Sequence, residues 1–129
     1  MTEPQQVESE ALARRIAAIC DAKKASDLVA LDVRDLVGYT DFLVICTASN
    51  ERLAKAVKDE VRERLKRELG ISPGSVEGET ELRWVLLDYL DCVLHVFVPE
   101  TRDYYRLEAL WGEAPRLDLG LNEKAQARA

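Results

Sequence analysis

The chain has 129 residues, 47% of them hydrophobic and 33% charged, with a formal net charge of −6 and three cysteines. This length suits one domain with its own core, and no apolar run reaches the roughly 20 residues of a membrane span. Phosphate binding needs concentrated basic charge, so we expect no direct nucleic-acid binding and a basic protein as the partner. The acidic N-terminus is unlike a targeting signal, so we expect a cytoplasmic protein without membrane attachment.

The N-terminal part of the chain has the spacing of a helix followed by a strand. Residues 1–8 are expected to be frayed, and Ser9 to cap a helix over residues 9–24. The apolar stripe of this helix repeats at helical spacing and consists of Leu12, Ile16, Ile19 and Cys20. Residues 28–33, rich in β-branched and apolar side chains, are expected to form a short strand.

The longest predicted helix follows a second strand. Residues 41–47 are apolar on both faces, which is typical of a central strand. Ser49 or Asn50 then stands at the N-cap position of a helix over residues 51–69, and Gly70 ends it. Its charged face is interpreted as solvated.

The longest apolar tract, residues 81–99, is predicted to be a hairpin of two strands. It follows a loop over residues 71–80 that leads to a short edge strand or directly to the hairpin. Trp84, Leu86 and Asp88 alternate with Val85, Leu87 and Tyr89, so they point to opposite faces. In the second arm Val93, His95 and Phe97 oppose Cys92, Leu94, Val96 and Val98.

The C-terminal part is predicted to be a helix over residues 101–111 and a loosely ordered tail over residues 112–129. The folded domain is therefore expected to cover residues 9–111. The fold class is α/β, with a mixed sheet of four to five strands and helices packed on it. Three helices, one of them short, are too few to cover two apolar faces. We therefore expect an exposed apolar patch that meets a partner, including a second copy in a homodimer.

Residues suited to catalysis or metal binding are sparse. His95 is the only histidine and lies between apolar neighbours in a strand, which favours a structural or interface role over a catalytic base. Glu77, Glu79 and Glu81 have the i, i+2 spacing of a two-metal site, but they lie in or next to a glycine-bearing loop without a phosphate clamp. The three cysteines are widely spaced, and we interpret them as buried thiols. No enzyme activity, cofactor or metal is expected.

Trp84, Leu86 and Asp88 instead combine an aromatic anchor, an aliphatic neighbour and a charge on one strand face, which is typical of an interface hot spot. The alternative is that Trp84 and Leu86 belong to the core under the first or last helix.

Four segments in order, residues 41–52, 76–79, 84–97 and 104–111, closely resemble the ribosomal silencing factor family, also called Iojap-like. The resemblance runs from about Leu12 to Trp111. It implies a fold related to nucleotidyltransferases without their catalytic carboxylates. It also implies a translational repressor that binds the large ribosomal subunit through ribosomal protein fourteen and sterically blocks joining of the small subunit. The partner-binding residues it suggests are Trp84, Leu86, Asp88, Asp91, His95, Tyr104 and Tyr105.

Two positions depart from the pattern of that family, which usually has glycine where this chain has Ala48 and Leu90. Leu90 must accept a turn conformation that glycine takes freely, so a different turn type or local strain is expected.

Two other functions remain open at this point. One is a metal-dependent, nucleotidyltransferase-like enzyme that uses Glu77, Glu79 and Glu81, and the other is a dimerisation module.

Overall fold

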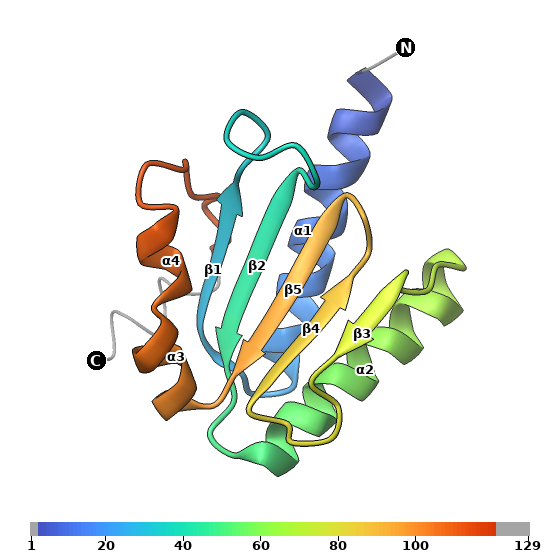
Figure 1. The fold of residues 1–129 in the computed structure, drawn as a ribbon. Coiled ribbons are helices and arrows are strands. Elements are labelled where there is room, and N and C mark those ends of the chain that lie inside the picture. The colour runs from blue at the N-terminus through green and yellow to red at the C-terminus, as the bar shows by residue number, and fades with distance from the viewer. Residues whose placement is uncertain (1–2, 121–129) are drawn as a thin grey trace.

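The computed structural model describes residues 3–120 of the chain. It contains a five-stranded sheet with the strand order β1-β2-β5-β4-β3 (Figure 1). β2 and β5 run parallel, and the other neighbouring strands run antiparallel. The strands are β1 Ser26–Asp32, β2 Phe42–Thr47, β3 Ser75–Glu77, β4 Trp84–Asp88 and β5 Cys92–Phe97. The predicted mixed α/β sheet is confirmed, and the short edge strand before the hairpin is β3.

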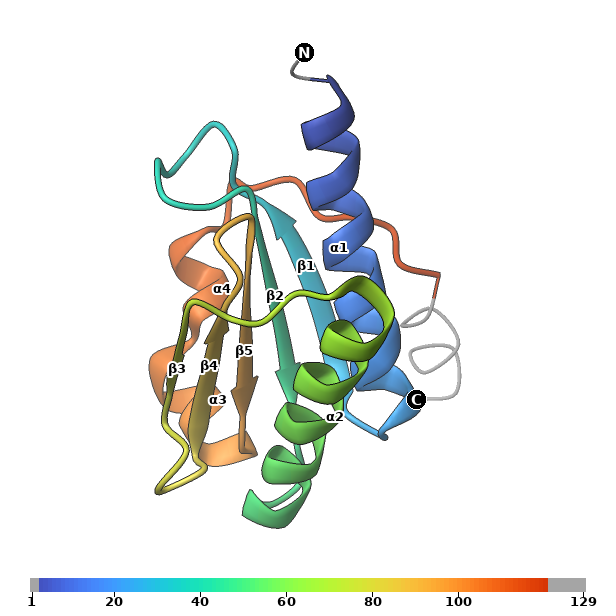
Figure 2. The same cartoon turned by 90° about the vertical axis from the view of Figure 1, so that its right-hand side faces the viewer.

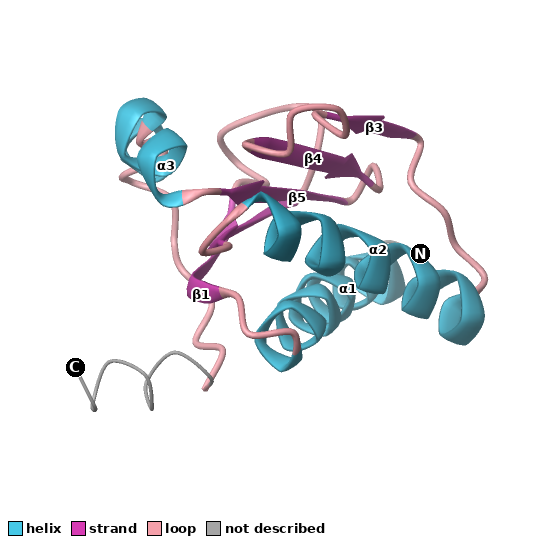
Figure 3. Cartoon of the chain, turned by 90° about the horizontal axis from the view of Figure 1, so that it is seen from below, coloured by secondary structure: helices cyan, strands magenta, loops and turns pink. Residues whose placement is uncertain are grey.

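Two long helices, α1 Glu3–Ala22 and α2 Glu51–Leu69, cover one face of the sheet (Figures 2 and 3). The main hydrophobic core fills the space between this helical layer and the strands. β2 and β5 are buried along their whole length, as their two-sided apolar sequences require. The large core side chains are Ile16, Ile19, Phe42, Val57, Val61, Leu65, Leu87 and Leu94.

The ends of α2 follow from its capping residues. The side chain of Asn50 accepts a hydrogen bond from the backbone N–H of Leu53 at 2.8 Å, which satisfies one of the free donors of the first turn. Gly70 ends the helix in the left-handed region, with φ of 72°, where a residue without Cβ is not strained. Asn50, rather than Ser49, is thus the cap, and the predicted bounds of this helix are confirmed.

The prediction that Ser9 caps the first helix is wrong. α1 begins at Glu3, and Ser9 is a buried residue inside it. Pro4 stands in the first turn, where proline is well tolerated because its missing N–H has no helical partner there. Serine favours N-caps but does not prevent a helix from starting earlier. Residues 1–2 of the stretch expected to be frayed lie outside the described residues.

The prediction of one continuous helix over residues 101–111 is also wrong. The chain forms α3 Pro99–Tyr105 and α4 Leu107–Leu110, separated by Arg106 at φ of 48°. On either side of α4, Leu107 and Trp111 pack against a second core cluster, which consists of Leu31, Val33, Leu43, Ile45, Val93, Phe97 and Ala114. Arg106 therefore has a left-handed backbone conformation that its local sequence does not favour, next to apolar side chains that pack on the sheet.

Part of the segment predicted to be a loose tail pairs with the free edge of β1. The N–H of Asp32 donates to the carbonyl of Pro115 at 2.8 Å, and the N–H of Leu117 donates to the carbonyl of Ala30 at 2.9 Å. Residues 114–117 thus satisfy backbone groups that an edge strand would leave exposed. The prediction of a loose segment is wrong for these residues, and residues 121–129 lie outside the described part. The domain boundaries stay a prediction.

The second face of the sheet is only partly covered. Figure 2 shows α3 and α4 on the side opposite α1 and α2, and Figure 1 places them near β1. Within residues 3–120, no helix lies over β3, β4 and β5 on this side (Figure 1). We call the surface of β4 and β5 that points away from α1 and α2 the open face.

Gly78, which follows β3, allows the chain to pass close to β4. Its φ is 83°, and a Cβ at this position would lie 1.9 Å from the carbonyl oxygen of Trp84. Gly78→Ala should therefore lower the free energy of unfolding by at least about 2 kcal/mol, from backbone strain and a clash with backbone. Gly38→Ala is the matched control, because nothing lies within 4 Å of a Cβ there. Equal urea midpoints for the two variants would contradict this explanation.

Candidate partner-binding surface

Alternation along β4 places three of the predicted site residues on the open face. Trp84 lies opposite Phe97, Leu86 opposite His95, and Asp88 opposite Val93 in the β4–β5 register. Trp84, Leu86 and Asp88 are each half-buried, whereas Val85 and Leu87 on the other face are fully buried in the main core. The predicted division of the hairpin into two faces is confirmed.

Aromatic side chains connect the open face to α3. The ring of Trp84 stacks on Phe97 with centroids 4.9 Å apart and contacts Tyr105 at 4.7 Å. Tyr104 meets Tyr105 edge-on at 5.0 Å and is 80% exposed. We call Trp84, Phe97, Tyr104 and Tyr105 the aromatic cluster. It runs from a buried ring to a solvent-exposed one, so part of its apolar area is free to contact a partner.

Arg102 fixes the position of α3, and hence of the two tyrosines. Its buried guanidinium donates to the carbonyl of Asp27 at 2.6 Å and to the hydroxyl of Thr47 at 2.8 Å. Charge-assisted hydrogen bonds of this kind are stronger than neutral ones. This anchor could not be predicted from the sequence, because the partners of Arg102 are far away in the chain and no local pattern marks them.

His95 lies beneath Trp84 and is 7% exposed. The indole Nε1–H of Trp84 donates to Nδ1 of His95 at 3.0 Å. Burial lowers the pKa of His95 to about 4, because removal from water disfavours the charged imidazolium. His95 is therefore neutral at physiological pH, as a structural or interface histidine would be.

The β4–β5 turn holds two acidic residues and a strained leucine. Asp88 accepts a hydrogen bond from the backbone N–H of Leu90 at 2.8 Å. Leu90 has φ of 75° and is 70% exposed, so the expected local strain is present. Asp91 is exposed, and its backbone carbonyl accepts from the N–H groups of Asp41 and Phe42, each at 3.1 Å. The turn thus projects an apolar side chain and a carboxylate beside the open face.

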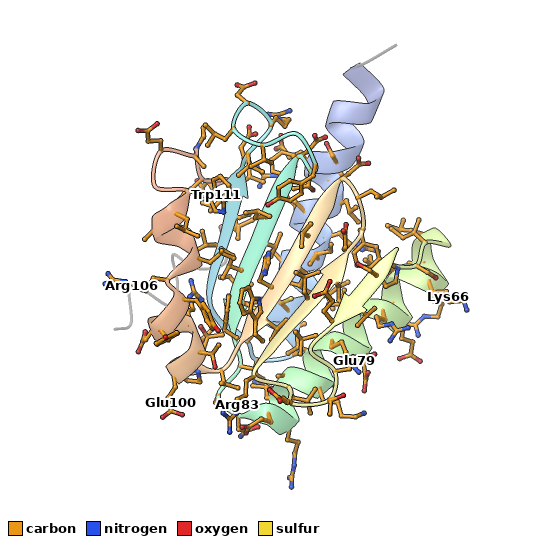
Figure 4. The ribbon with its side chains drawn as sticks, viewed as in Figure 1. Lys66, Glu79, Arg83, Glu100, Arg106 and Trp111 are labelled. Atoms are coloured by element: carbon orange, nitrogen blue, oxygen red, sulfur yellow. The ribbon has the colours of Figure 1, made fainter. Side chains whose placement is uncertain are left out.

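Large exposed apolar side chains gather in the segments around the open face. They come from the β1–β2 loop, the β4–β5 turn, α3 and α4, and they are Leu36, Tyr39, Leu90, Tyr104, Tyr105 and Leu110. Leu69 at the end of α2, on the opposite side of the molecule, is the remaining one among the described residues. In Figure 4, Trp111 lies beside α4 at the upper end of the sheet, and Arg83 and Glu79 lie at its lower end. Such a concentration is unusual for a surface that meets only water.

A cavity of about 480 Å³ borders the aromatic cluster at this lower end, lined by Glu79, Glu81, Arg83, Trp84 and Tyr105 among others. Glu79 is engaged elsewhere: its carboxylate accepts from Lys58 at 3.0 Å and from Arg62 at 3.1 Å. The hydrogen bond from Lys58 holds the pKa of Glu79 below its usual value. Glu77 lies in β3. Within residues 3–120, no group of three or more His, Cys, Asp or Glu is arranged to hold a metal ion.

Among the charged residues of α2, Lys58 is the one that is buried. It is a buried residue, paired with Glu79 and with Asp59, whose Oδ1 lies 3.0 Å from its Nζ. A signal was available in the sequence, because Ala54, Lys58, Val61 and Leu65 follow the 4-3-4 spacing of a core-facing stripe. The pair between Lys58 and Glu79 connects the β3–β4 loop to α2.

A sequence profile of the family described as "ribosomal silencing factor during starvation" matches residues 6–129 of the chain. The chain belongs to the ribosomal silencing factor family. It is 41% identical over 109 residues to ribosomal silencing factor RsfS of Bacillus subtilis, an alignment that covers 83% of this chain and 92% of that protein. It is 33% identical over 122 residues to the chloroplastic protein Iojap of Arabidopsis thaliana, covering 94% of this chain and 50% of that protein.

A crystal structure from Chromobacterium violaceum has the same fold. It superposes on this member of the silencing factor family with a TM-score of 0.73 at 34% identity, covering 81% of this chain and 84% of that one. The names of the relatives indicate a ribosome-silencing role and a regulatory factor rather than an enzyme. Among the described residues, no helix has the length and apolar character needed to cross a membrane.

The structure of this family member brings most of the predicted site residues together. Trp84, Leu86, Asp88, His95 and Tyr105 share the open face or border it, with Tyr104 beside Tyr105. Asp91 lies apart from them, in the exposed turn. Trp84 and Leu86 also pack against the second core cluster. The buried part of each side chain therefore belongs to the core, and the exposed part is available to a partner. That these residues bind a partner stays a prediction.

The depressed pKa of His95 should make folding pH-dependent. The pKa is about 4 in the folded protein against 6.5 for an unperturbed histidine, so below pH 6.5 the unfolded chain binds a proton that the folded chain does not. The free energy of unfolding should fall by about 2 kcal/mol between pH 7 and pH 5. Urea unfolding of the parent and of His95→Gln at the two pH values measures this difference. A decrease of equal size in both proteins would assign it to other groups.

Proposed function

We propose that this protein is a translational repressor that binds the large ribosomal subunit through ribosomal protein fourteen and prevents the small subunit from joining. The observation that carries the proposal is the open face, where a partly exposed aromatic cluster includes the exposed rings of Tyr104 and Tyr105. The names of the relatives support a ribosomal target, and the resemblance of the motifs supports the choice of subunit and protein.

The open face has the composition of a protein-binding hot spot. Trp84 and Tyr105 offer large, rigid apolar area, and packing on Phe97 and Tyr104 limits their freedom before binding. Preordered aromatic side chains lose little conformational entropy when a partner covers them. Leu86, at the centre of β4, extends this area, and we propose that the three side chains form the buried centre of the contact.

Acidic groups near the open face suit a basic partner. Asp88 lies at the end of β4, Asp91 in the adjoining turn and Glu77 on β3 opposite Leu86. The net charge of the chain is −6, so its field would attract a basic ribosomal protein before contact. Charges at the rim mainly set the association rate and its salt dependence, whereas the buried aromatic centre sets the residence time.

Repression by this mechanism needs occupancy and no chemical step. The factor would cover the surface of the large subunit that the small subunit must approach, and it would act in the cytoplasm. No cofactor is part of the proposal. The enzyme alternative based on Glu77, Glu79 and Glu81 is disfavoured by the engagement of Glu79 with Lys58 and Arg62. Self-association through the open face, as a homodimer, stays a prediction and competes for the same surface.

The test is co-sedimentation of the purified protein with isolated large subunits, with and without small subunits. Trp84→Ala should weaken binding about 30-fold, equivalent to a hot-spot loss of about 2 kcal/mol. Because Trp84 also stacks on Phe97, Tyr104→Ala serves as a second variant with little structural cost, and it should also weaken binding. Leu69→Ala, an exposed apolar position on α2, is the matched control and should bind like the parent.

Four results would contradict the proposal. One is that the parent protein stays in the supernatant at low salt, and another is that it binds without lowering the yield of joined ribosomes. Equal binding by the parent, Trp84→Ala and Tyr104→Ala would place the contact outside the open face. Dilution-dependent mass together with indifference to ribosomes would favour the dimerisation module instead.

A further inference from the structure

We propose that His95 presents a fixed Nε2–H donor to a neutral carbonyl oxygen of the protein that docks on the open face. The inference rests on the proposed function, because it specifies one contact of that same surface. Trp84 has a second role in it, since its side chain determines which nitrogen of His95 carries the proton.

The hydrogen bond between the two side chains fixes the tautomer of His95. The indole nitrogen of Trp84 can donate a hydrogen bond but cannot accept one. It lies 3.0 Å from Nδ1 of His95, so Nδ1 must be the unprotonated acceptor. In a neutral imidazole the single proton is then on Nε2. His95 is neutral here, because burial lowers its pKa to about 4.

Nε2 of His95 retains access to the open face. Among the described side chains, the polar atoms that are sealed from solvent and lack a partner are the hydroxyls of Thr40 and Tyr89. Nε2 is not one of them. Within residues 3–120, the side-chain hydrogen bond of His95 is the one that Nδ1 accepts from Trp84. The residue is only 7% exposed and shares the open face with Leu86. A docked partner would remove the remaining water and leave a buried donor that needs an acceptor.

The surroundings of His95 favour a neutral acceptor over a carboxylate. Its neighbours across the strands are apolar, Leu86 on β4 and Ile45 on β2. Asp88 lies on the same face two residues beyond Leu86, so its negative charge would repel a second carboxylate. Burying a carboxylate without a countercharge is strongly unfavourable, whereas a backbone or amide carbonyl carries no such penalty when it is hydrogen-bonded.

The fixed tautomer favours selective binding. A histidine free to exchange its proton would offer a donor or an acceptor at the same position, and a partner would have to select one form. The bond from Trp84 removes that choice before binding, and packing on Phe97 keeps both rings in place. A preorganised donor contributes more to affinity than a mobile one. A partner that places a hydrogen-bond donor opposite Nε2–H could not form this bond, so the fixed tautomer discriminates against such partners.

Nitrogen NMR of the free protein, labelled at its only histidine, tests the tautomer first. The expected result is a proton on Nε2 and none on Nδ1 at pH 7, and Trp84→Phe should allow a mixture. A proton on Nδ1 in the parent would overturn the inference whether or not the protein binds ribosomes. This measurement is therefore independent of the proposed function.

Two matched substitutions then test the contact in the large-subunit binding assay. His95→Asn keeps an oxygen acceptor near the position of Nδ1 for Trp84 but lacks a donor at the position of Nε2. His95→Gln reaches the Nε2 position with its amide nitrogen. We expect His95→Asn to bind about tenfold more weakly, equivalent to one neutral hydrogen bond, and His95→Gln to recover most of that loss. The indole N–H resonance of Trp84 reports whether the substituted side chain still accepts its bond.

The outcomes are distinguishable. Parent-like binding by His95→Asn would overturn the inference while leaving the proposed function intact, whereas absence of binding by the parent would refute the proposed function itself. If His95→Asn fails to fold, titration of the labelled parent with isolated ribosomal protein fourteen decides the question. The Hε2 proton should then shift and exchange more slowly with water, and an unchanged signal under saturating binding would overturn the inference.

Discussion

The central strands β2 and β5 are apolar on both faces, yet two long helices cover only one of those faces. This constraint determines much of the remaining structure. Short α3 and α4, the β1–β2 loop and the half-buried side chains of β4 shield the second face without sealing it. Burial of the strand residues stabilises the fold, while the outer edges of Trp84, Leu86 and the tyrosines remain in contact with water. One arrangement therefore serves both stability and binding.

Specific polar contacts hold this second layer in place. Arg102 fastens α3 to the β1–β2 end of the sheet, the pair between Lys58 and Glu79 ties the β3–β4 loop to α2, and the bond from Trp84 fixes His95. Each contact positions a segment that borders the open face. Leu90 keeps an exposed apolar side chain in a left-handed conformation, although asparagine or glycine would adopt that conformation with less strain. The surface is thus rigid at its centre and apolar at its edge, as binding by occupancy requires.

Local periodicity in the sequence was sufficient to predict α2, the alternation of the hairpin and the shared face of Trp84, Leu86 and Asp88. These features depend on neighbours one to four residues apart. The break at Arg106 and the pairing of residues 114–117 with β1 were missed, because both result from contacts between distant segments. The apolar sequence neighbours of His95 favour a structural or interface role, but its hydrogen bond to Trp84 depends on the strand register, which local periodicity does not predict. The buried Lys58 shows that a charged residue within a helical stripe can face the core when a partner such as Glu79 is available.

Site-specific photo-crosslinking to ribosomes tests most directly whether the open face is the ribosome-binding surface. A benzophenone side chain at Tyr104 would stand beside the aromatic cluster, and the same group at Leu69 would stand on the helical side of the molecule. The account predicts a crosslink from position 104 to ribosomal protein fourteen of the large subunit and none from position 69. Crosslinks from position 69 alone, or from position 104 only to a second copy of this chain, would contradict it.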